Sequence, residues 1–469
     1  MHCSYILGVS AVALILAGHA GAARIAAVER AVYHDDAIRQ RDAARLADAS
    51  RREKAAAEAF AARYNLPVRF EADGNVYELM RLDANGQPEY YVTCNKNAAI
   101  STAANLVRGT APYNVSGSNW IVGVWDGGAV LNTHQEFGGR VTVKDGGSAH
   151  YHSTHVGGTI GAAGVSANAK GMAPQTLIDS YEWTSDTSEM TSRAASAPGQ
   201  PTKIYLSNHS YGSSSGWSGN YWYHALSVTQ SPYFGQYNST ARSWDIVAFN
   251  APYYLIVKAA GNDRNDNAPS SGATFYYLSG SSWYAATYNP ATHALGDATY
   301  KGGYDTIPTY GNAKNILTVG AVNDAVSGSS RVPANGTMSV FSSWGPADDG
   351  RIKPDVVGNG VSLYSTYTPN YNSYDSISGT SMASPNVCGS AVLLVEYFAQ
   401  LHAGGAMRSS TLKALIIHTA DDLGNAGPDY RFGWGLMNTK RAADLIYEDT
   451  VGTSASITED LLNSGKPLD

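Results

Sequence analysis

Cysteine is scarce in this sequence, with three residues in 469. Loss of an N-terminal leader would remove Cys3 and leave Cys94 and Cys388, which are too few for a disulfide framework. Charged residues are also sparse, at 15%, whereas 43% of the residues are hydrophobic. The composition therefore predicts a globular chain that is stabilised by a sizeable core.

An excess of basic residues is absent as well. Lys and Arg number 32 against 39 Asp and Glu, which gives a formal charge of -7. Nucleic acids and anionic membrane surfaces are therefore not expected as partners. The 48 glycines and 31 tyrosines indicate many turns and much amphipathic aromatic surface, which suits extended polymer substrates.

Long apolar runs are missing after the first 23 residues, "MHCSYILGVSAVALILAGHAGAA". An apolar stretch from Tyr5 to Gly18 and the pattern Ala20-Gly21-Ala22 predict a signal peptide over residues 1–22, and hence export to an extracellular or periplasmic location. The stretch before Tyr5 contains no Lys or Arg, so an uncleaved membrane anchor is the alternative. No contact with a membrane is expected once the signal has been removed.

Residues 23–105 have a different character from the rest of the chain. Residues 24–63 carry 9 basic and 7 acidic side chains and are rich in alanine, which predicts a solvated helix. Short alternating runs follow, broken at Asp73-Gly74-Asn75 and Asn85-Gly86. We expect a small helix-plus-strands module here. Either it is an ordinary N-terminal subdomain or it is a removable pro-segment.

Residues 106–450 alternate short apolar runs, such as "IVGVWD" and "LIVKAAGND", with helical patterns. Nearly continuous apolar strands indicate a parallel sheet that is covered on both faces. We therefore predict an α/β, doubly wound, mostly parallel sheet with helices on both faces. Residues 451–469 read as a polar C-terminal tail. Ligands bind such sheets at the carboxyl ends of the strands.

Three polar side chains are predicted to lie at or near the carboxyl ends of the strands. Asp126 ends the run "IVGVWD", and Asn262 follows "LIVKAAG". His152 opens a predicted helix in "HYHSTHVGGTIGAAG". A carboxylate, a neutral imidazole and an uncharged amide donor are thereby predicted to meet at one rim.

Ser381 lies in "SISGTSMASPNVCGSAVLLVEYF", where polar residues change abruptly into an apolar helix. Unpaired N–H groups at a helix N-terminus favour developing negative charge, and Thr380 is the expected N-cap. Pro385 cannot donate to the carbonyl of Ser381. Serine needs a base, so the hypothesis is that Asp126 orients His152, His152 takes the Ser381 proton and Asn262 binds the oxyanion.

These residues resemble the subtilisin-like serine peptidases. The resemblance rests on "VGVWDGG", "HSTHVGGTI", "SNHSYG", "AAGND" and "GTSMASPNV", and it extends over about residues 119–447. It implies a serine-type endopeptidase with Asp126, His152 and Ser381 as the triad and Asn262 with the Ser381 N–H as the oxyanion hole.

The resemblance also implies substrate-binding residues: Ser210, Tyr211, Gly212, Ala260 and Gly261 would border an extended peptide. Tyr211 and His209 depart from the commonest family residues, and Gly127 replaces a usual hydroxyl residue. Relatives carry a cleaved pro-segment, which residues 23–105 would supply. No cofactor is required for the chemistry and no metal site is assigned. Relatives bind structural calcium, for which "GNDRNDNAPSSG" is the candidate loop.

Other interpretations were open for several motifs. His150, His152 and His155 could bind zinc, although no HExxH or supporting carboxylate motif accompanies them. Gly212 to Gly216 satisfies G-x-S-x-G, an esterase signature that should lead into a helix. Cys388 is expected to be a buried packing residue rather than a nucleophile. A non-catalytic peptide-binding module is the alternative function, against which the presence of Asp126, His152, Asn262 and Ser381 argues.

Overall fold

The computed structural model describes residues 36–459, apart from residues 73–74, 83–85, 87, 94–98, 281, 298, 328–329 and 453–455. The predicted signal peptide, residues 1–22, lies outside the described residues. So do 13 residues of the predicted module, 23–35, and residues 460–469 of the tail.

The main domain is built on a seven-stranded sheet, and each adjacent pair of its strands is parallel. In spatial order the strands are β17 (Val356–Asn359), β14 (Leu317–Val322), β11 (Leu255–Ala259), β7 (Leu206–His209), β4 (Ile121–Asp126), β6 (Leu177–Glu182) and β5 (Val141–Val143). The chain enters at β4, extends the sheet to one side through β5 and β6, and then to the other side from β7. The carboxyl end of β4 is therefore the switch point at which such sheets bind ligands.

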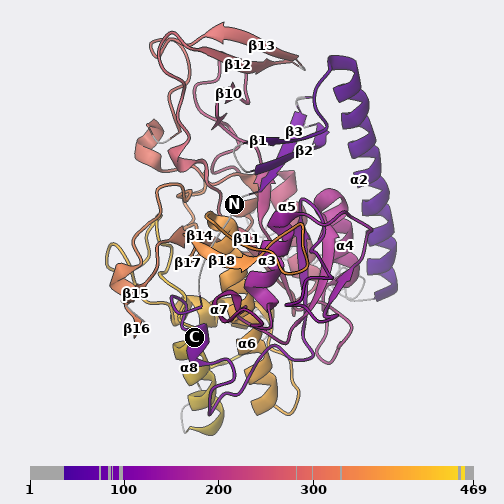
Figure 1. The fold of residues 1–469 in the computed structure, drawn as a ribbon, viewed down its shortest axis with the longest axis vertical. Helices are drawn as coiled ribbons and strands as arrows, with labels where there is room; N and C mark the ends of the chain where they lie inside the picture. The colour runs from indigo at the N-terminus through magenta and orange to yellow at the C-terminus, as the bar shows by residue number, and fades with distance from the viewer. Residues whose placement is uncertain are drawn as a thin grey trace, which may run out of the picture.

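Alternating residues on the strands divide the core into two layers. Val122 and Val124 of β4 face one hydrophobic cluster, while Trp125 faces the other. Helices α3 (Tyr151–Gly161), α6 (Thr380–Leu401), α7 (Ser409–His418) and α8 (Thr439–Val451) contribute to or border the first cluster. Helices α4 (Asp186–Arg193) and α5 (Ser239–Asn250) cover the second. The predicted α/β sheet with helices on both faces is confirmed (Figure 1).

The N-terminal module consists of a long helix, α2 (Asp36–Tyr64), and the antiparallel strands β1 (Arg69–Ala72), β2 (Asn75–Leu82) and β3 (Pro88–Thr93). Helix α2 runs along the side of the molecule next to α4 (Figure 1). Strand β3 pairs with β8 (Tyr211–Ser213) of the main domain, so one sheet joins the two parts. This is the predicted helix-plus-strands arrangement.

The segment between the module and the main domain packs on the main core. Ser101 accepts a hydrogen bond from the Ala325 N–H, and the Thr102 carbonyl accepts two from Thr439. Ala103 and Ala104 are buried. The expected boundary after residue 105 therefore falls inside a segment whose contacts belong to the main domain.

A second, smaller sheet extends the main domain beyond β8 and lies at the top of Figure 1. Its order is β13 (Ser282–Thr287), β12 (Thr274–Ser279), β10 (Tyr221–Trp222) and β9 (Trp217–Ser218). Two further pairs are β15 (Val326–Ser327) with β16 (Ser330–Arg331), and β18 (Leu363–Thr366) with β19 (Tyr374–Ile377). Single 3-10 turns occupy Ala104–Leu106, Ala167–Ala169, Trp183–Ser185, Asp263–Asn265, Tyr300–Gly303, Thr309–Asn312 and Pro333–Asn335. Among the described residues, no helix is long and apolar enough to cross a membrane.

Candidate active site

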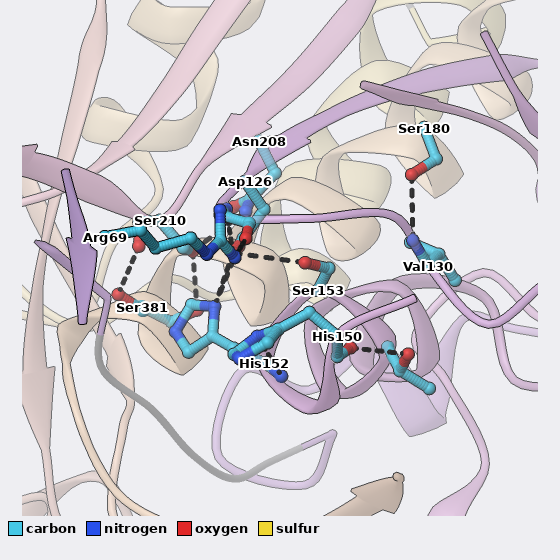
Figure 2. A network of polar contacts seen from close by, with 12 residues as sticks. Arg69, Asp126, Val130, His150, His152, Ser153, Ser180, Asn208, Ser210 and Ser381 are labelled. Carbon is cyan, nitrogen blue, oxygen red and sulfur yellow. Dashed lines mark hydrogen bonds and ion pairs between the residues drawn. The ribbon is translucent and has the colours of Figure 1, made fainter. Parts of the chain in front are cut away.

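Asp126, His152 and Ser381 meet above the carboxyl end of β4, as Figure 2 shows. Asp126 is the last residue of β4, His152 lies in the first turn of α3, and Ser381 lies in the first turn of α6. All three are buried, at 0%, 0% and 3% exposure. Residues that are 26 and 229 positions apart in the sequence thus converge because three elements end or begin at one edge of the sheet.

The carboxylate of Asp126 holds the imidazole of His152 through two contacts. Nδ1 of His152 lies 2.8 Å from each of the two carboxylate oxygens. The Gly127 N–H donates to Oδ1 at 2.7 Å, and the Ser153 hydroxyl donates to it at 3.3 Å. Because the carboxylate accepts a hydrogen bond from Nδ1–H, Nε2 is left as the nitrogen that can accept a proton.

Ser381 lies beside the imidazole of His152 in Figure 2. Its hydroxyl donates to the carbonyl oxygen of Ser210 at 3.0 Å. A hydroxyl has one proton, so this bond must be exchanged for one to His152 before the imidazole can act as a base on Ser381. A rotation about the Cα–Cβ bond of Ser381 is the movement that this exchange requires.

Pro385 accounts for a second hydrogen bond between Ser210 and Ser381. The ring of Pro385 carries no N–H, so the Ser381 carbonyl loses its partner four residues along helix α6. The Ser210 hydroxyl donates to this carbonyl at 2.7 Å. The strand that precedes β8 therefore completes the first turn of the helix that carries Ser381.

Asn262 contacts the start of the same helix. Its Oδ1 atom accepts hydrogen bonds from the Thr380 N–H at 2.8 Å and from the Thr380 hydroxyl at 3.0 Å. A backbone N–H can only donate, so these bonds fix which end of the amide is oxygen and leave Nδ2 as the donor end. The expectation that Thr380 is the N-cap is wrong. Thr380 is the first helical residue, and the side chain of Asn262 caps the helix from another element.

The expected substrate-binding residues border a pocket of about 140 Å³ next to Ser381. Tyr211 and Gly212 form one wall, and Ala260 and Gly261 form part of the other. Gly261 has φ +117°, and a Cβ there would lie within 3 Å of Asp263, Pro308 and Ser343, so only glycine fits. Ser210 is buried beside the pocket, and strand β3 lies along the edge of β8.

The comparisons with known proteins agree with this geometry. The family model Peptidase_S8, the subtilase family, matches residues 117–435, more than half of the chain. The chain belongs to the subtilase family.

Individual relatives match this subtilase over shorter stretches. Subtilisin DY of Bacillus licheniformis is 33% identical over 152 residues, which are 31% of this chain and 49% of that protein. Serine protease AprX of Bacillus subtilis is 30% identical over 149 residues, which are 29% of this chain and 31% of that protein. The chain thus spans about half, or less than half, of the length of these curated relatives.

A solved structure shares the fold of the subtilase. The Clostridium perfringens CspB protease superposes with a TM-score of 0.53 at 17% identity, covering 74% of this chain and 99% of that one. The resemblance read from the five motifs is confirmed at the level of family and fold.

Sequence reasoning missed the polar network on the far side of β8. The Tyr211 hydroxyl donates to Asp186 at 2.8 Å, and Nδ1 of His209 lies 2.9 Å from the same hydroxyl. Nε2 of His209 lies 2.8 Å from the Ser207 hydroxyl. Burial holds the pKa of His209 well below its usual value, and the positive charge of Lys258 lowers it further. The two residues that depart from the family pattern, Tyr211 and His209, are therefore partners of one another.

Arg69 is a second residue that the sequence did not point to. Its guanidinium, on strand β1 of the module, donates to the Gly127 carbonyl, directly after Asp126 (Figure 2). No local pattern around Arg69 marks this contact, because it joins strand β1 to the turn after β4, 58 residues away in the sequence.

The zinc interpretation finds no support in the described part of the chain. His152 binds Asp126, Nε2 of His155 lies 3.1 Å from the Leu363 carbonyl, and Nδ1 of His150 accepts the His152 N–H. Within the described residues, no group of three or more His, Cys, Asp or Glu side chains is placed to hold a metal.

The esterase interpretation lacks its structural context. Gly216 leads into the two-residue strand β9 rather than into a helix. A nucleophile elbow requires a helix after the turn. Cys388 is fully buried inside α6, and burial raises the pKa of its thiol, which fits the expected packing role.

The candidate calcium loop, residues 261–272, contributes to the pocket. Asp263 lines the pocket and its carboxylate accepts a hydrogen bond from the Ser343 hydroxyl at 3.3 Å. This loop gathers too few described carboxylates for a metal site. Structural calcium stays a prediction to which no residues are assigned.

Proposed function

We propose that this subtilase is a serine endopeptidase that cleaves exposed, extended segments of polypeptides through an acyl-enzyme. The observation that carries the proposal is the close pairing of Asp126 with His152 beside Ser381, in which Nδ1 of His152 lies 2.8 Å from both carboxylate oxygens. The three residues have the three chemical roles that serine acyl transfer needs: a nucleophile, a base and a group that orients the base.

The mechanism begins when the Ser381 hydroxyl turns from the Ser210 carbonyl to Nε2 of His152. The oxygen attacks the scissile carbonyl carbon as its proton passes to His152, and Asp126 stabilises the imidazolium that results. The tetrahedral oxyanion accepts hydrogen bonds from Nδ2 of Asn262 and from the Ser381 N–H. His152 then protonates the leaving amine, and a water molecule hydrolyses the acyl-enzyme by the same route.

The bonding of Asn262 supports its part in this mechanism. Thr380 occupies the Oδ1 end, so the amide cannot rotate freely and the Nδ2 donor is held in place before the reaction. A donor that is fixed in advance needs no reorganisation as the oxyanion forms, and this is the source of its effect on rate.

The pro-segment predicted over residues 23–105 is proposed to end before Ala99 and to block the cleft until it is cut. Support comes from β3, which pairs antiparallel with β8 and places Thr93 opposite Tyr211 and Val92 opposite Gly212. An extended substrate is expected to add to the same edge, so substrate and β3 compete. Export by the leader in residues 1–22, to an extracellular or periplasmic location, completes the proposal.

Labelling with a fluorophosphonate tests the activity. Matured enzyme should react at Ser381, Ser381→Ala should not react, and a chelator should leave the initial labelling unchanged. Failure of matured wild-type protein to label would refute the enzymatic proposal and favour a non-catalytic peptide-binding module.

N-terminal sequencing of the active material tests the pro-segment. The expected N-terminus lies between residues 94 and 99, because β3 ends at Thr93 and residues from Ala99 onward pack on the main core. Active protein that retains strand β3 would contradict the proposal. Ser381→Ala is the matched control, since it should remain uncut when it is expressed alone.

A further inference from the structure

Arg81, on strand β2 of the N-terminal module, reaches into the main domain. Its Nη2 atom donates to the Thr240 hydroxyl and to the Tyr310 hydroxyl, both at 2.8 Å. Its guanidinium carbon lies 5.9 Å from the centroid of the Tyr310 ring. Thr240 and Tyr310 are 9% and 1% exposed, so the arginine is received by buried polar groups. We call Thr240, Tyr310 and Asp186 the arginine seat.

Asp186 supplies the negative charge of the arginine seat. It is the first residue of α4 and is 6% exposed. Burial raises the pKa of its carboxyl, while hydrogen bonds from Tyr211 and Thr187 and the positive charge of Arg81 lower it. A buried carboxylate costs free energy unless a cation or donors accompany it, so Arg81 stabilises the ionised form of Asp186.

The seat belongs to the main domain, whereas its cation belongs to the module. The arginine of the same helix, Arg193, is engaged with Asp179 at 2.5 Å. Removal of the module would therefore take the cation away from Asp186 and leave the hydroxyls of Thr240 and Tyr310 as acceptors. A vacated site with one carboxylate and two hydroxyls is suited to a guanidinium or ammonium group.

The seat is within reach of a substrate bound along β8. Successive residues of a strand alternate between faces, so Ser213 and Tyr211 share the face on which Tyr211 meets Asp186. A substrate residue opposite Ser213 points to that face as well. Arg81 pairs with position 89, and position 91 pairs with Ser213, so Arg81 stands one strand and two residues away. Those offsets, about 5 Å and 7 Å, combine to about 8 Å between the two backbone positions, and an extended arginine or lysine side chain covers about 6–7 Å of that distance.

We propose that the arginine seat is a substrate subsite for a basic side chain located N-terminal to the scissile bond, and that Arg81 occupies it in the precursor. This inference rests on the proposed function, because it requires that the module leaves and that a polypeptide takes the place of β3. Thr240, Tyr310 and Asp186 are then specificity-determining residues of this subtilase.

The test compares arginine with citrulline, which has nearly the same shape but no charge, at successive positions upstream of the scissile bond in model peptides. Matured wild-type enzyme should prefer arginine by about 10-fold in kcat/KM at one position, the effect of one charged hydrogen-bonded contact. At the other upstream positions the ratio should stay near one, except where the pocket next to Ser381 receives the side chain. Asp186→Asn should bring the ratio at the preferred position close to one.

Control variants keep the result interpretable. Glu448→Gln removes a carboxylate from an exposed position of α8 and should retain the preference. Thr240→Val and Tyr310→Phe each delete one acceptor of the seat without touching Asp186, and each should reduce the ratio by about 3-fold. If Asp186→Asn does not fold, these two variants test whether the arginine seat sets the preference for arginine.

Two failures can be told apart in the same sample. Enzyme that labels with fluorophosphonate but cleaves arginine and citrulline peptides equally at every upstream position would overturn the subsite and leave the proposed function standing. Matured protein that does not label refutes the proposed function, and the substrate role of the seat with it. An arginine preference that persists in Asp186→Asn and in both acceptor variants would also overturn the assignment.

Discussion

Ser210 and Ser381 exchange two hydrogen bonds across the cleft. The Ser381 hydroxyl donates to the Ser210 carbonyl at 3.0 Å, and the Ser210 hydroxyl donates to the Ser381 carbonyl at 2.7 Å. One bond holds the hydroxyl of Ser381, the proposed nucleophile, in a resting orientation, and the other replaces the helical bond that Pro385 cannot make.

Ser210→Ala should therefore affect both stability and turnover. The variant leaves a buried carbonyl without its donor, which costs about 1–3 kcal/mol in the free energy of unfolding. Turnover should fall several-fold because the first turn of α6 shifts. Urea denaturation and steady-state kinetics measure the two effects.

Ser384→Ala is the matched control, because Ser384 lies on the same helix and its buried hydroxyl bonds to Asn208 at 2.7 Å. It should lose similar stability but keep its turnover. Equal loss of turnover in both variants would show that Ser210 does not position Ser381.

Asn262→Ala should lower kcat by about 100- to 1000-fold, the usual effect of removing one oxyanion donor, while KM changes little. Asn262→Asp separates this role from helix capping. The aspartate keeps an oxygen for Thr380 but has no donor, so it should preserve the unfolding free energy and still lose turnover. Normal turnover in Asn262→Asp would refute the oxyanion role.

Asp263 gives the pocket next to Ser381 a charge that changes near neutral pH. Burial raises the pKa of Asp263 to about 7, although the Ser343 hydroxyl and the charge of Lys258 lower it. The carboxyl is therefore mostly neutral at pH 6 and mostly ionised at pH 8. For peptides whose side chain enters this pocket, the ratio of kcat/KM for lysine to that for norleucine should rise over this range.

Asp263→Asn should make that ratio independent of pH, while fluorophosphonate labelling reports whether the active site remains intact. A rise with pH that persists in Asp263→Asn would assign the effect to another group.

The Glu136 carboxylate holds the loop at residues 164–166. It accepts hydrogen bonds from the Gly164, Val165 and Ser166 N–H groups at 2.6–2.9 Å, and from the Tyr374 hydroxyl at 2.7 Å. Burial raises the pKa of Glu136, but these donors outweigh burial and hold it below its usual value.

Because the folded-state pKa is depressed, the stabilisation by Glu136 is fully present above the ordinary glutamate pKa and is lost as the pH falls through the folded-state value. Glu136→Gln should cost about 2 kcal/mol at pH 7, since the amide nitrogen cannot accept. The difference from wild type should shrink in acid. A difference that is constant with pH in urea denaturation would show that the charge of Glu136 is not involved.

Local pattern was sufficient to locate the residues of the candidate site. Asp126 and Asn262 follow apolar runs long enough to be read as buried strands, and His152 and Ser381 stand where helical patterns begin. Parallel strands bring such ends to one edge, so their convergence could be predicted without the pairing order. The family resemblance then supplied the substrate-binding roles that are expected of Ser210 and Gly212.

Contacts between distant segments could not be predicted in this way. Arg69 and Arg81 are ordinary surface arginines in the sequence, and it is the docking of the module, through the pairing of β3 with β8 and the packing of α2 on α4, that brings Arg69 to Gly127 and Arg81 to Thr240 and Tyr310. The four-stranded sheet that includes β9 and β10 was missed because its first two strands have two residues each, too few for a period to be recognised. Thr380 was misread because its cap comes from Asn262, 118 residues away.

The tether between β3 and the main domain also determines how the cleft responds to dilution. While the chain is continuous, β3 meets the edge of β8 at an effective concentration that the linker sets, typically in the millimolar range, however little protein is present. A single break after Thr93 turns the same pairing into an encounter between two molecules. After the break, the concentration of the protein decides whether the cut segment stays bound in the cleft, so release into a large volume favours an open cleft.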